Sequence, residues 1–372
     1  RMDQAKNWEE YREASNYFNI PGENMVWADK FGDIGWQAVG IAPIRKTHSG
    51  LVPVRGDGNF EWENYIEIIK KPSLFNPEKG YIATANQNVT PEDYDRWDVI
   101  GYDWADPYRG DRVNSVLEGK DKFDMEDMIN LQVDYFSIPS KQIIELSKGY
   151  INNNIEYFEK LSKWDNVLDK NSVEAGIYIE WQTQIYFEFM REFVPKEVQK
   201  YIEIQIYKVI EGISKMDNQQ KSVFLNKTLD QAINSLKEKY GENSSDWVYG
   251  QSNYKHVKIY HPLEKIVNDS IKDIIALKTY PRGGDGFTPG STSNELNQRS
   301  GGSFRVVINT KDWDNSFATN SPGQSGNPKS EFYKNLYEDW ANDKFFPLLY
   351  SKNKILMNLS DRKVFKPLNQ SE

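Results

Sequence analysis

The sequence contains no cysteine and only three histidines among its 372 residues. The absence of cysteine excludes disulfide scaffolds, thiolate metal sites and cysteine nucleophiles. The three histidines, His48, His256 and His261, form neither an HExxH motif nor a pair at i, i+4 spacing, which excludes a zinc site of the zincin type. A catalytic triad built on histidine is not expected either.

Long apolar runs and an excess of positive charge are absent as well. No window approaches the roughly 20 apolar residues that span a bilayer. The first residues, RMDQAKNWEE, are polar, so we expect no membrane insertion and no signal peptide in this sequence. Lys and Arg number 46 against 55 Asp and Glu, a formal net charge of -9, so nucleic acid is not expected as a partner.

Aromatic residues are abundant and compensate for a modest hydrophobic content. Hydrophobic residues account for 38% of the sequence, but aromatic residues reach 14%, with 11 Trp, 22 Tyr and 18 Phe. Their large apolar area is enough to build a core, which excludes a disordered chain. The length corresponds to two domains or one large one.

The first third predicts a helix, a hairpin and then irregular loops. Residues 3–16 carry aromatic side chains at helical spacing. Residues 24–28 and 34–41 are rich in β-forming residues and are joined by a turn containing Gly32, which predicts a hairpin. From Pro43 to Gly110 the density of Gly, Pro, Asn and Asp predicts short strands and loops.

The middle third predicts helices. One begins after Asp124 as N-cap, and a second is expected to be capped by Ser140. Residues 173–193 place apolar residues in a stripe at spacing four, which predicts a long core helix rather than a cofactor site. Two further helices are predicted over 196–214 and 225–241.

The last third returns to strands. Residues 283–303 are rich in Gly, Ser, Thr and Asn, and we interpret them as a long surface loop. Strands are predicted around Val307 and over 316–319, followed by a helix over 331–343. Because a lone hairpin is unstable, we expect strands from both ends of the chain to meet in one sheet.

We divide the chain into three parts on this basis. Residues 1–123 form a β-rich part with the site loops, residues 124–241 a helical insertion, and residues 242–372 the strands and helix that return to the core.

Two asparagines in GYIATANQNVTPEDY form the first candidate site. Asn86 and Asn88 lie in a polar loop after a short strand. An asparagine amide there is a good uncharged donor for a developing oxyanion. The alternative is an asparagine that only pins its own loop as an Asx turn.

Two arginines in GYDWADPYRGDRV form the second candidate site. Arg109 and Arg112 lie three residues apart, with Asp103, Asp106 and Asp111 close by in sequence. Arg112 is placed to hold a carboxylate or to tether a catalytic loop. The alternative is a structural ion pair.

Taken in order, the segments of this sequence resemble the penicillin acylase family of N-terminal-nucleophile amidohydrolases. The matching pieces are AKNWEEYREA, NMVWADKFGDIGW, LVPVRGDGNFEWENYI, NPEKGYIATANQNVTPEDY, GYDWADPYRGDRV, MEDMINLQVDYFSIP, WVYGQSNYKHVKIYHPL, GGDGFT, GGSFRVVINTKDWDNSFATNSPGQSGNP and FYKNLYEDWANDKFFPLLY. They run from Ala5 to about Lys352. The resemblance implies an α+β fold, the C-terminal portion of the β chain in a four-layer αββα sandwich with a helical insertion.

The resemblance also implies a reaction, the hydrolysis of a linear acyl amide of the penicillin or N-acyl amine type through an acyl-enzyme. In this family the β chain begins with a serine freed by self-cleavage, whose own amine acts as the base. This sequence begins with Arg1. We therefore expect the serine, the first part of the β chain and the α chain to be missing partners, and this chain alone to be inactive. Family members are commonly exported, which favours a periplasmic or extracellular location.

Three residues take roles from the resemblance. Asn86 matches the family's oxyanion-hole asparagine, and Arg112 matches the arginine near the nucleophile that orients the reacting groups. Asp98 falls where some members place a calcium-ligating aspartate, with a second ligand carbonyl near Gly50. No cofactor is required, and structural calcium, which needs six to eight oxygens, is the one ion considered.

A different class of protein remains as an alternative. Exposed aromatic rings stack on sugars, so the chain could be a secreted carbohydrate-binding or glycosidase-like protein with Asp103 and Asp106 as acid and base. The helical core spacing of the aromatic residues and the ordered family segments argue against it.

Overall fold

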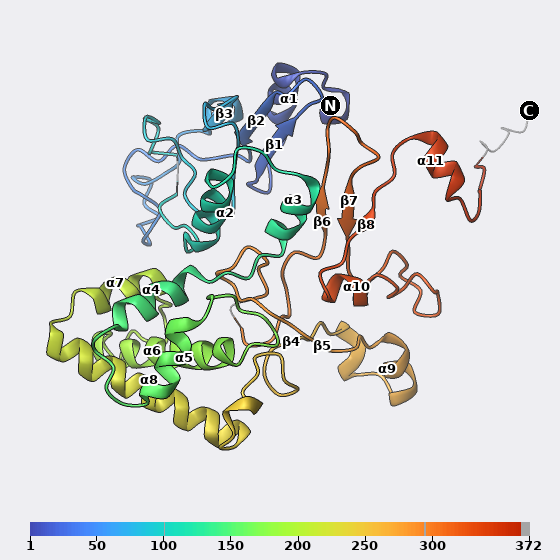
Figure 1. Cartoon of the computed structure of the whole chain (residues 1–372). Coiled ribbons are helices and arrows are strands. Elements are labelled where there is room, and N and C mark those ends of the chain that lie inside the picture. Colours follow the sequence, from blue (N-terminus) through green and yellow to red (C-terminus); the bar gives the residue numbers. More distant parts are fainter. Residues whose placement is uncertain (100, 294, 366–372) are drawn as a thin grey trace, which may run out of the picture.

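The computed structural model describes residues 1–99, 101–293 and 295–365. Figure 1 shows two small groups of strands beside each other and a body of helices below one of them. The helices of that body are separated in sequence from both groups of strands, so the chain leaves the strands, builds the helices and returns.

The predicted hairpin is confirmed in the first sheet, and the helix predicted over residues 3–16 is confirmed in a shorter form. Strands β1 (Asn24–Ala28), β2 (Ile34–Ala38) and β3 (Ser73–Phe75) pair antiparallel in the order β1-β2-β3. Helix α1 (Trp8–Ser15) covers this sheet, and its Trp8 ring lies where any side chain at Gly35 would be. A glycine on β2 is therefore what lets the helix pack onto the sheet.

The helical body contains α4 to α8, which are α4 (Ile138–Ser147), α5 (Ile155–Lys163), α6 (Val173–Phe193), α7 (Ile206–Ser214) and α8 (Asn218–Tyr240). The helix before them, α3 (Met125–Gln132), lies against β6 instead (Figure 1). The core of the helical body is formed by α6 packed against α8, with Ile177, Trp181 and Ile185 fully buried. The predicted core stripe of 173–193 is confirmed at these three residues, whereas Phe189 is partly buried and Phe193 at the end of the helix is exposed.

The helix starts in the middle third of the chain are partly as predicted. Asp124 caps α3 in a capping box with Asp127, which confirms the first prediction. The cap of α4 is Ser137 and not Ser140, because the Ser137 side chain accepts the Ser140 amide at 3.2 Å and Pro139 fits the first helical turn.

The helix predicted over 196–214 is shorter in the structure. It begins only at Ile206, whose amide donates to the Asp106 carboxylate at 2.9 Å. The cap therefore comes from a residue far away in the sequence, and local sequence could not indicate this start.

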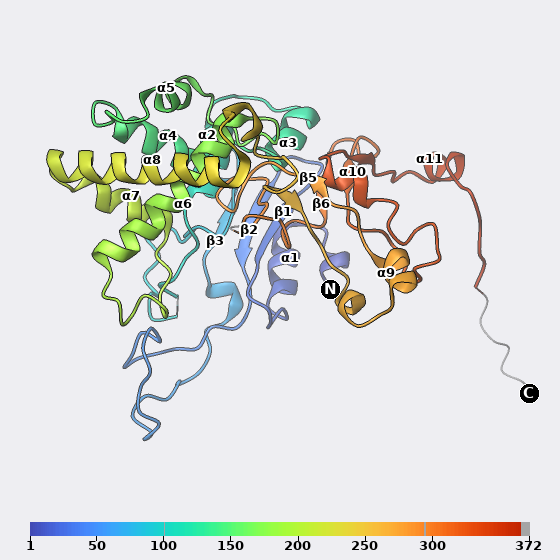
Figure 2. The ribbon, with the colours of Figure 1, turned by 90° about the horizontal axis from the view of Figure 1, so that it is seen from below.

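The second sheet corrects the expectation of one shared sheet. Strands β6 (Arg305–Val307), β7 (Phe317–Thr319) and β8 (Phe346–Pro347) form their own antiparallel sheet in the order β6-β7-β8. Each sheet consists of strands that follow one another in the sequence. The central strand is β2 in the first sheet and β7 in the second. Figures 1 and 2 show β1 and β6 near one another without pairing.

The remaining elements are short. They are helices α2 (Tyr108–Glu118), α9 (Asp269–Ile275), α10 (Tyr337–Ala341) and α11 (Lys352–Met357), strands β4 (His256–Val257) and β5 (Tyr280–Pro281), and the 3-10 turns η1 (Met2–Gln4), η2 (Ile68–Lys70), η3 (Ser244–Asp246) and η4 (Pro262–Lys265). The helix predicted over 331–343 is reduced to α10. Among the described residues, none of the helices has both the length and the apolar character to cross a membrane.

The segment 283–303 is only partly the surface loop that its composition indicates, because residues 283–292 are buried or half-buried whereas residues 299–303 are exposed. Thr288, Thr292 and Gln298 are fully buried. Side chains at Gly284 or Gly290 would overlap the Tyr135 ring, so these glycines are needed for close packing rather than for flexibility.

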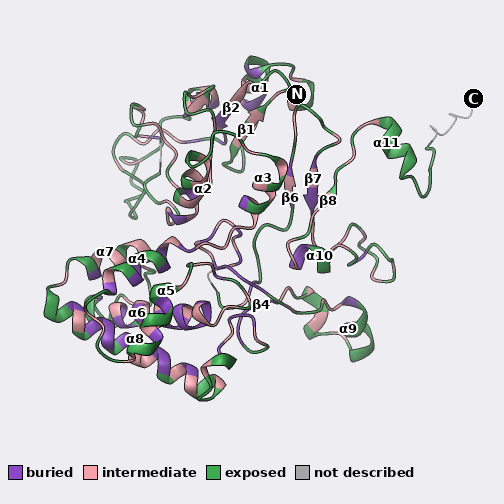
Figure 3. Cartoon of the chain, in the orientation of Figure 1, coloured by how far each residue is buried: buried purple, intermediate pink, exposed green. Residues whose placement is uncertain are grey.

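A junction at Asp134 and Gly290 is one of the places where the helical body meets the rest of the chain. The Gly290 amide donates to the Asp134 carbonyl at 3.0 Å, so the chain leaves toward the helical body and returns from it at neighbouring points. Figure 3 shows that buried residues concentrate in the helical body and at this junction. The helices α3 to α8 all fall in 124–241, and the three-part division itself stays a prediction.

Candidate functional site

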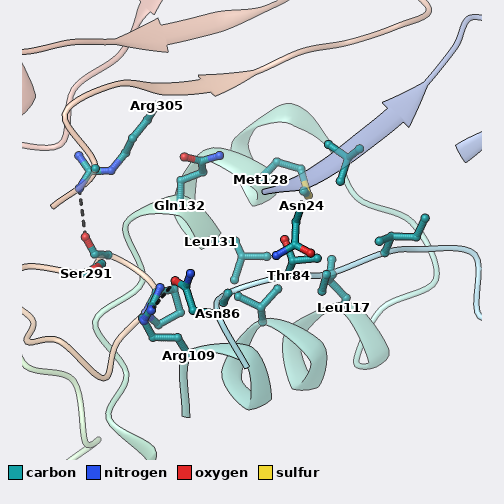
Figure 4. Close-up of a pocket in the computed structure, with 18 of the residues that line it drawn as sticks. Asn24, Thr84, Asn86, Arg109, Leu117, Met128, Leu131, Gln132, Ser291 and Arg305 are labelled. Atoms are coloured by element: carbon teal, nitrogen blue, oxygen red, sulfur yellow. Dashed lines mark hydrogen bonds between the residues drawn. The ribbon is translucent and has the colours of Figure 1, made fainter. Parts of the chain in front are cut away.

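The two groups of strands share one cavity of about 560 Å³. Its walls come from β1, the segment 82–86, α2, α3 and the approach to β6 (Figure 4). The lining residues are Glu23, Asn24, Val26, Ile82, Ala83, Thr84, Ala85, Asn86, Arg109, Val113, Leu117, Met128, Leu131, Gln132, Pro289, Gly290, Ser291, Gly302, Phe304 and Arg305. One wall is apolar, and amide and guanidinium groups are set into it.

Asn86 lies on this wall with its side chain held from one end. Its backbone has φ +68°, a left-handed conformation that asparagine tolerates better than most residues. Its Oδ1 accepts a hydrogen bond from Arg109 Nη2 at 2.8 Å (Figure 4). Because a guanidinium only donates, the amide group of Asn86 must be the end that is turned away from Arg109.

The loop that carries Asn86 is fastened to α2 by Gln87. The Gln87 Oε1 accepts the Ala85 amide at 2.6 Å, which holds the loop in a tight turn. The Gln87 carboxamide packs directly on Gly110 of α2, where a Cβ would overlap it. Asn86 and Arg109 are thus held against each other by the residues that follow them in sequence.

Asn88 pins its own loop, which is the structural role considered above as the alternative for Asn86. Its Oδ1 accepts the Thr90 amide at 3.0 Å, an Asx turn within the loop. Asn88 does not line the cavity. The structure therefore separates the two asparagines, one facing a cavity and the other closing a turn.

Arg112 lies behind the cavity wall. Its Nε and Nη2 donate to Asp134 Oδ2 at 2.9 and 2.6 Å, and its guanidinium lies 4.4 Å over the Phe136 ring. It lines a separate depression of about 300 Å³. The structure brings Arg109, rather than Arg112, to Asn86.

The sequence indicates Arg109 as one of two candidate arginines but gives no reason to prefer it to Arg112. The two arginines occur in one motif, and their partners, Asn86 and Asp134, lie more than 20 residues away from them. The signal that could have selected Arg109 is its place directly before Gly110, a helical glycine against which another segment can pack closely.

The Asp98 carboxylate is already paired with an arginine of this chain. Its two carboxylate oxygens accept from Arg96 Nε and Nη2, both at 2.8 Å, and this pairing lowers the pKa of Asp98. Gly50 has φ +81° and packs beside the side chain of Arg45. In the described ranges no three acidic or histidine side chains gather as metal ligands. These residues do not fit a calcium site, and calcium binding stays an untested prediction.

The acids proposed for the carbohydrate alternative are not set as a pair. Asp106 accepts the Ile206 amide at the start of α7, and burial raises the pKa of its carboxyl to about 6. Asp103 is exposed. Asp106 therefore acts as the cap of a helix.

The cavity wall carries two cations that are held away from water. Burial lowers the pKa of Arg109 and that of Arg305. Arg305 is 5% exposed and donates to the Gly290 carbonyl at 3.1 Å. Together with the amides of Asn24 and Gln132, these groups favour a ligand that presents oxygen acceptors or develops negative charge.

Comparisons with known proteins agree with this architecture. A sequence model described as penicillin amidase matches residues 1–356. The acyl-homoserine lactone acylase QuiP of Pseudomonas fluorescens is 25% identical over 389 residues, which covers 93% of this chain and 46% of that protein. The penicillin acylase 2 proenzyme of a Pseudomonas species is 24% identical over 95% of this chain and 47% of its own length. The chain spans about half the length of these relatives.

A solved structure confirms the fold class. The thermostable penicillin G acylase from Alcaligenes faecalis superposes with a TM-score of 0.71 at 17% identity, over 99% of this chain and 71% of that one. The predicted α+β fold of the N-terminal-nucleophile hydrolase type is thereby confirmed.

Proposed function

The chain belongs to the penicillin amidase family, and from this premise we propose that it supplies the oxyanion-binding wall of an amidohydrolase that cleaves linear acyl amides through an acyl-enzyme. The relatives named as penicillin acylase and acyl-homoserine lactone acylase support the hydrolysis of an acyl amide. Asn86 is the proposed donor to the oxyanion.

In the proposed reaction the nucleophile is an N-terminal serine supplied from outside this sequence. Its oxygen attacks the amide carbonyl carbon while its own α-amine takes the proton. The carbonyl oxygen becomes negative and accepts from Asn86 Nδ2. The C–N bond then breaks as the amine leaves with the proton, and water hydrolyses the acyl-serine.

The observation that carries this proposal is the pose of Asn86. Its carboxamide oxygen is held by Arg109 at 2.8 Å, and it lines the shared cavity. An oxyanion needs fixed donors that are turned toward it before the charge develops, because then no reorganisation is required at the moment of reaction. Asn86 meets that requirement and Asn88 does not.

The proposed partners are the α chain and the first part of the β chain. Two features support them: the relatives are about twice as long as this chain, and β1 and β6 end their sheets on either side of the cavity. A strand from the missing part could pair with such an edge. Arg112, through Asp134 and Phe136, is proposed to anchor α2 behind the site.

The test is activity with and without the rest of the protein. This chain alone is expected to release no amine from a chromogenic acyl anilide, and joint expression with the upstream half of a natural precursor is expected to restore turnover. Turnover by the chain alone that disappears when an interior serine is replaced would contradict the proposal. Binding of oligosaccharides without any amide cleavage by the assembled protein would favour the carbohydrate alternative.

A further inference from the structure

We infer that Arg109 is a positioning residue for catalysis, which fixes and polarises the Asn86 carboxamide so that its Nδ2 donates to the reacting oxygen. This inference rests on the proposed function, since it assigns Arg109 a role that acts through Asn86. It is carried by the contacts of Arg109, described below, and by the place of both residues on the cavity wall.

The geometry gives Arg109 one clear task. It is the second residue of α2, and its Nη2 lies 2.8 Å from Asn86 Oδ1. A charge-assisted hydrogen bond of this kind is stronger than one between neutral groups. In Figure 4 the two side chains point toward one another at one end of the cavity.

Arg109 is not explained as a structural ion pair. Over the ranges that the structure describes, no carboxylate lies within 4.0 Å of its guanidinium, whereas Arg112, one turn further on, is paired with Asp134 at 2.6 Å. The Arg109 side chain is half-buried, and this burial lowers its pKa. A half-buried cation whose hydrogen-bond partner is an amide fits a role in orienting that amide.

The role has two physical parts. First, a carboxamide can rotate so that its oxygen and its nitrogen exchange places, and an oxygen turned to the oxyanion would repel it. A cation at Oδ1 prevents this rotation, because it would place Nδ2 hydrogens against the guanidinium. Second, positive charge at Oδ1 draws electron density from the amide and makes its N–H groups better donors.

The backbone of Asn86 makes this support necessary. A φ of +68° fixes the direction of the Cα–Cβ bond, and Gln87 fastens the loop to α2 through Gly110. These features place Asn86 but leave the rotation of its terminal amide undetermined. The Arg109 hydrogen bond is the contact that determines it.

The test uses the assembled two-chain enzyme. Arg109→Met is expected to lower kcat by about 10-fold to 10²-fold, less than the loss of the donor itself, with KM nearly unchanged. Arg109→Lys, which keeps the charge, is expected to recover part of kcat. In the Asn86→Ala background, Arg109→Met should cause little further loss, because the residue through which Arg109 acts is gone.

A matched control and a second variant keep the test decisive. Arg96→Met removes another arginine, one paired with Asp98 outside the cavity, and should leave kcat unchanged. If Arg109→Met does not fold, Arg109→Gln and Arg109→Lys are compared instead. Their kcat values provide the same readout when the two variants have equal melting temperatures.

Several outcomes would overturn the inference. A raised KM with unchanged kcat would mean that Arg109 binds an anionic group of the substrate directly. A full additional loss in the double variant would mean that Arg109 acts independently of Asn86. Unchanged kcat in Arg109→Met, with kcat lowered in Asn86→Ala, defeats this inference alone. Unchanged kcat in Asn86→Ala defeats the proposed function itself.

Discussion

At the scale of single residues, two asparagines of one loop show how the same side chain takes different roles. Asn86 meets Arg109 across the cavity wall, and Asn88 accepts an amide of its own loop at Thr90. Their sequence context is almost the same, because only Gln87 separates them. The difference arises from the left-handed backbone at Asn86, which turns its side chain toward α2.

This contrast leads to a prediction on catalysis. In the assembled enzyme, Asn86→Ala is expected to lower kcat by about 10² to 10³, roughly 2.7–4 kcal/mol, the usual loss for one oxyanion donor. KM should change little, because the donor acts on charge that exists only in the transition state. Steady-state kinetics on an acyl anilide measure both constants.

Asn88→Ala is the matched control for damage to the loop. It removes the hydrogen bond to Thr90 and should reduce kcat far less than Asn86→Ala. Equal losses in the two variants, or a lowered melting temperature as the main effect of Asn86→Ala, would assign Asn86 to loop structure instead of catalysis.

The sequence predicted Asn86 as a candidate and, of the two arginines, preferred Arg112. Asn86 is a candidate because an uncharged amide after a strand can donate to an oxyanion, and because its segment matches the penicillin acylase family in the order of segments. Arg112 was selected by the same family order, and the structure places it on Asp134. Which of two arginines reaches a site depends on packing between distant segments, and a single sequence does not contain that information.

At the scale of elements, the fit of the loop against α2 depends on Gly110. Gly110→Ala is expected to lower kcat as well as the melting temperature. The new methyl group overlaps Gln87 and displaces the loop that carries Asn86. Kinetics and thermal unfolding of the assembled enzyme measure the two effects.

Gly119 offers a comparison on the same helix. It follows the last residue of α2 with φ -79°, and a Cβ there would meet only the carbonyls of Ser115 and Val116, the closer at 3.4 Å. Gly119→Ala should therefore leave kcat unchanged. A loss of kcat in Gly119→Ala equal to that in Gly110→Ala would show that the effect belongs to the helix and not to the contact with Gln87.

The start of α7 leads to a prediction on pH. Asp106 accepts the Ile206 amide, yet burial raises the pKa of its carboxyl to about 6 from 3.8. The folded protein thus binds more protons than the unfolded chain between these values. The stabilising contribution of Asp106 to the free energy of unfolding is therefore fully present below pH 3.8 and is lost as the pH rises through 6.

Asp106→Asn is expected to remove that loss. It keeps an oxygen that accepts the amide of Ile206, so the melting temperature at pH 7 should be equal to or higher than that of the parent, with a smaller change between pH 4.5 and 7. Asp106→Ala, which has no cap, should destabilise by about 0.5–2 kcal/mol. A lower melting temperature of Asp106→Asn at pH 7 would show that the ionised carboxylate is favourable there.

Elements were predictable where their signals are local. Asp124 with Asp127, three residues on, and the stripe that includes Trp181 lie within their own helices, and both predictions hold. The start of α7 depends on Asp106, and the packing of Gly284 depends on Tyr135, each far away in sequence. Those two features were predicted wrongly because their causes are contacts between segments that only the fold brings together.

At the scale of the whole molecule, the fold class was predictable and the arrangement of the strands was not. The order of the matching segments identified the fold class, which the structural match confirms. The expectation of one sheet was wrong because it assumed that strands from both ends would pair with each other. The cavity between β1 and β6 separates the two sheets instead.

The hydrogen bond between Gly290 and Asp134 has a consequence for how such a protein can change during evolution. Because the chain departs at Asp134 and returns at Gly290, and these two residues are joined by a hydrogen bond, α3 and β6 can keep their spacing when the chain between them changes in length. Insertions at the far turns of the helices cost little closure entropy, since that cost grows only slowly with loop length. Changes in the length of these turns are therefore expected to leave the wall that carries Asn86 and Arg109 in place.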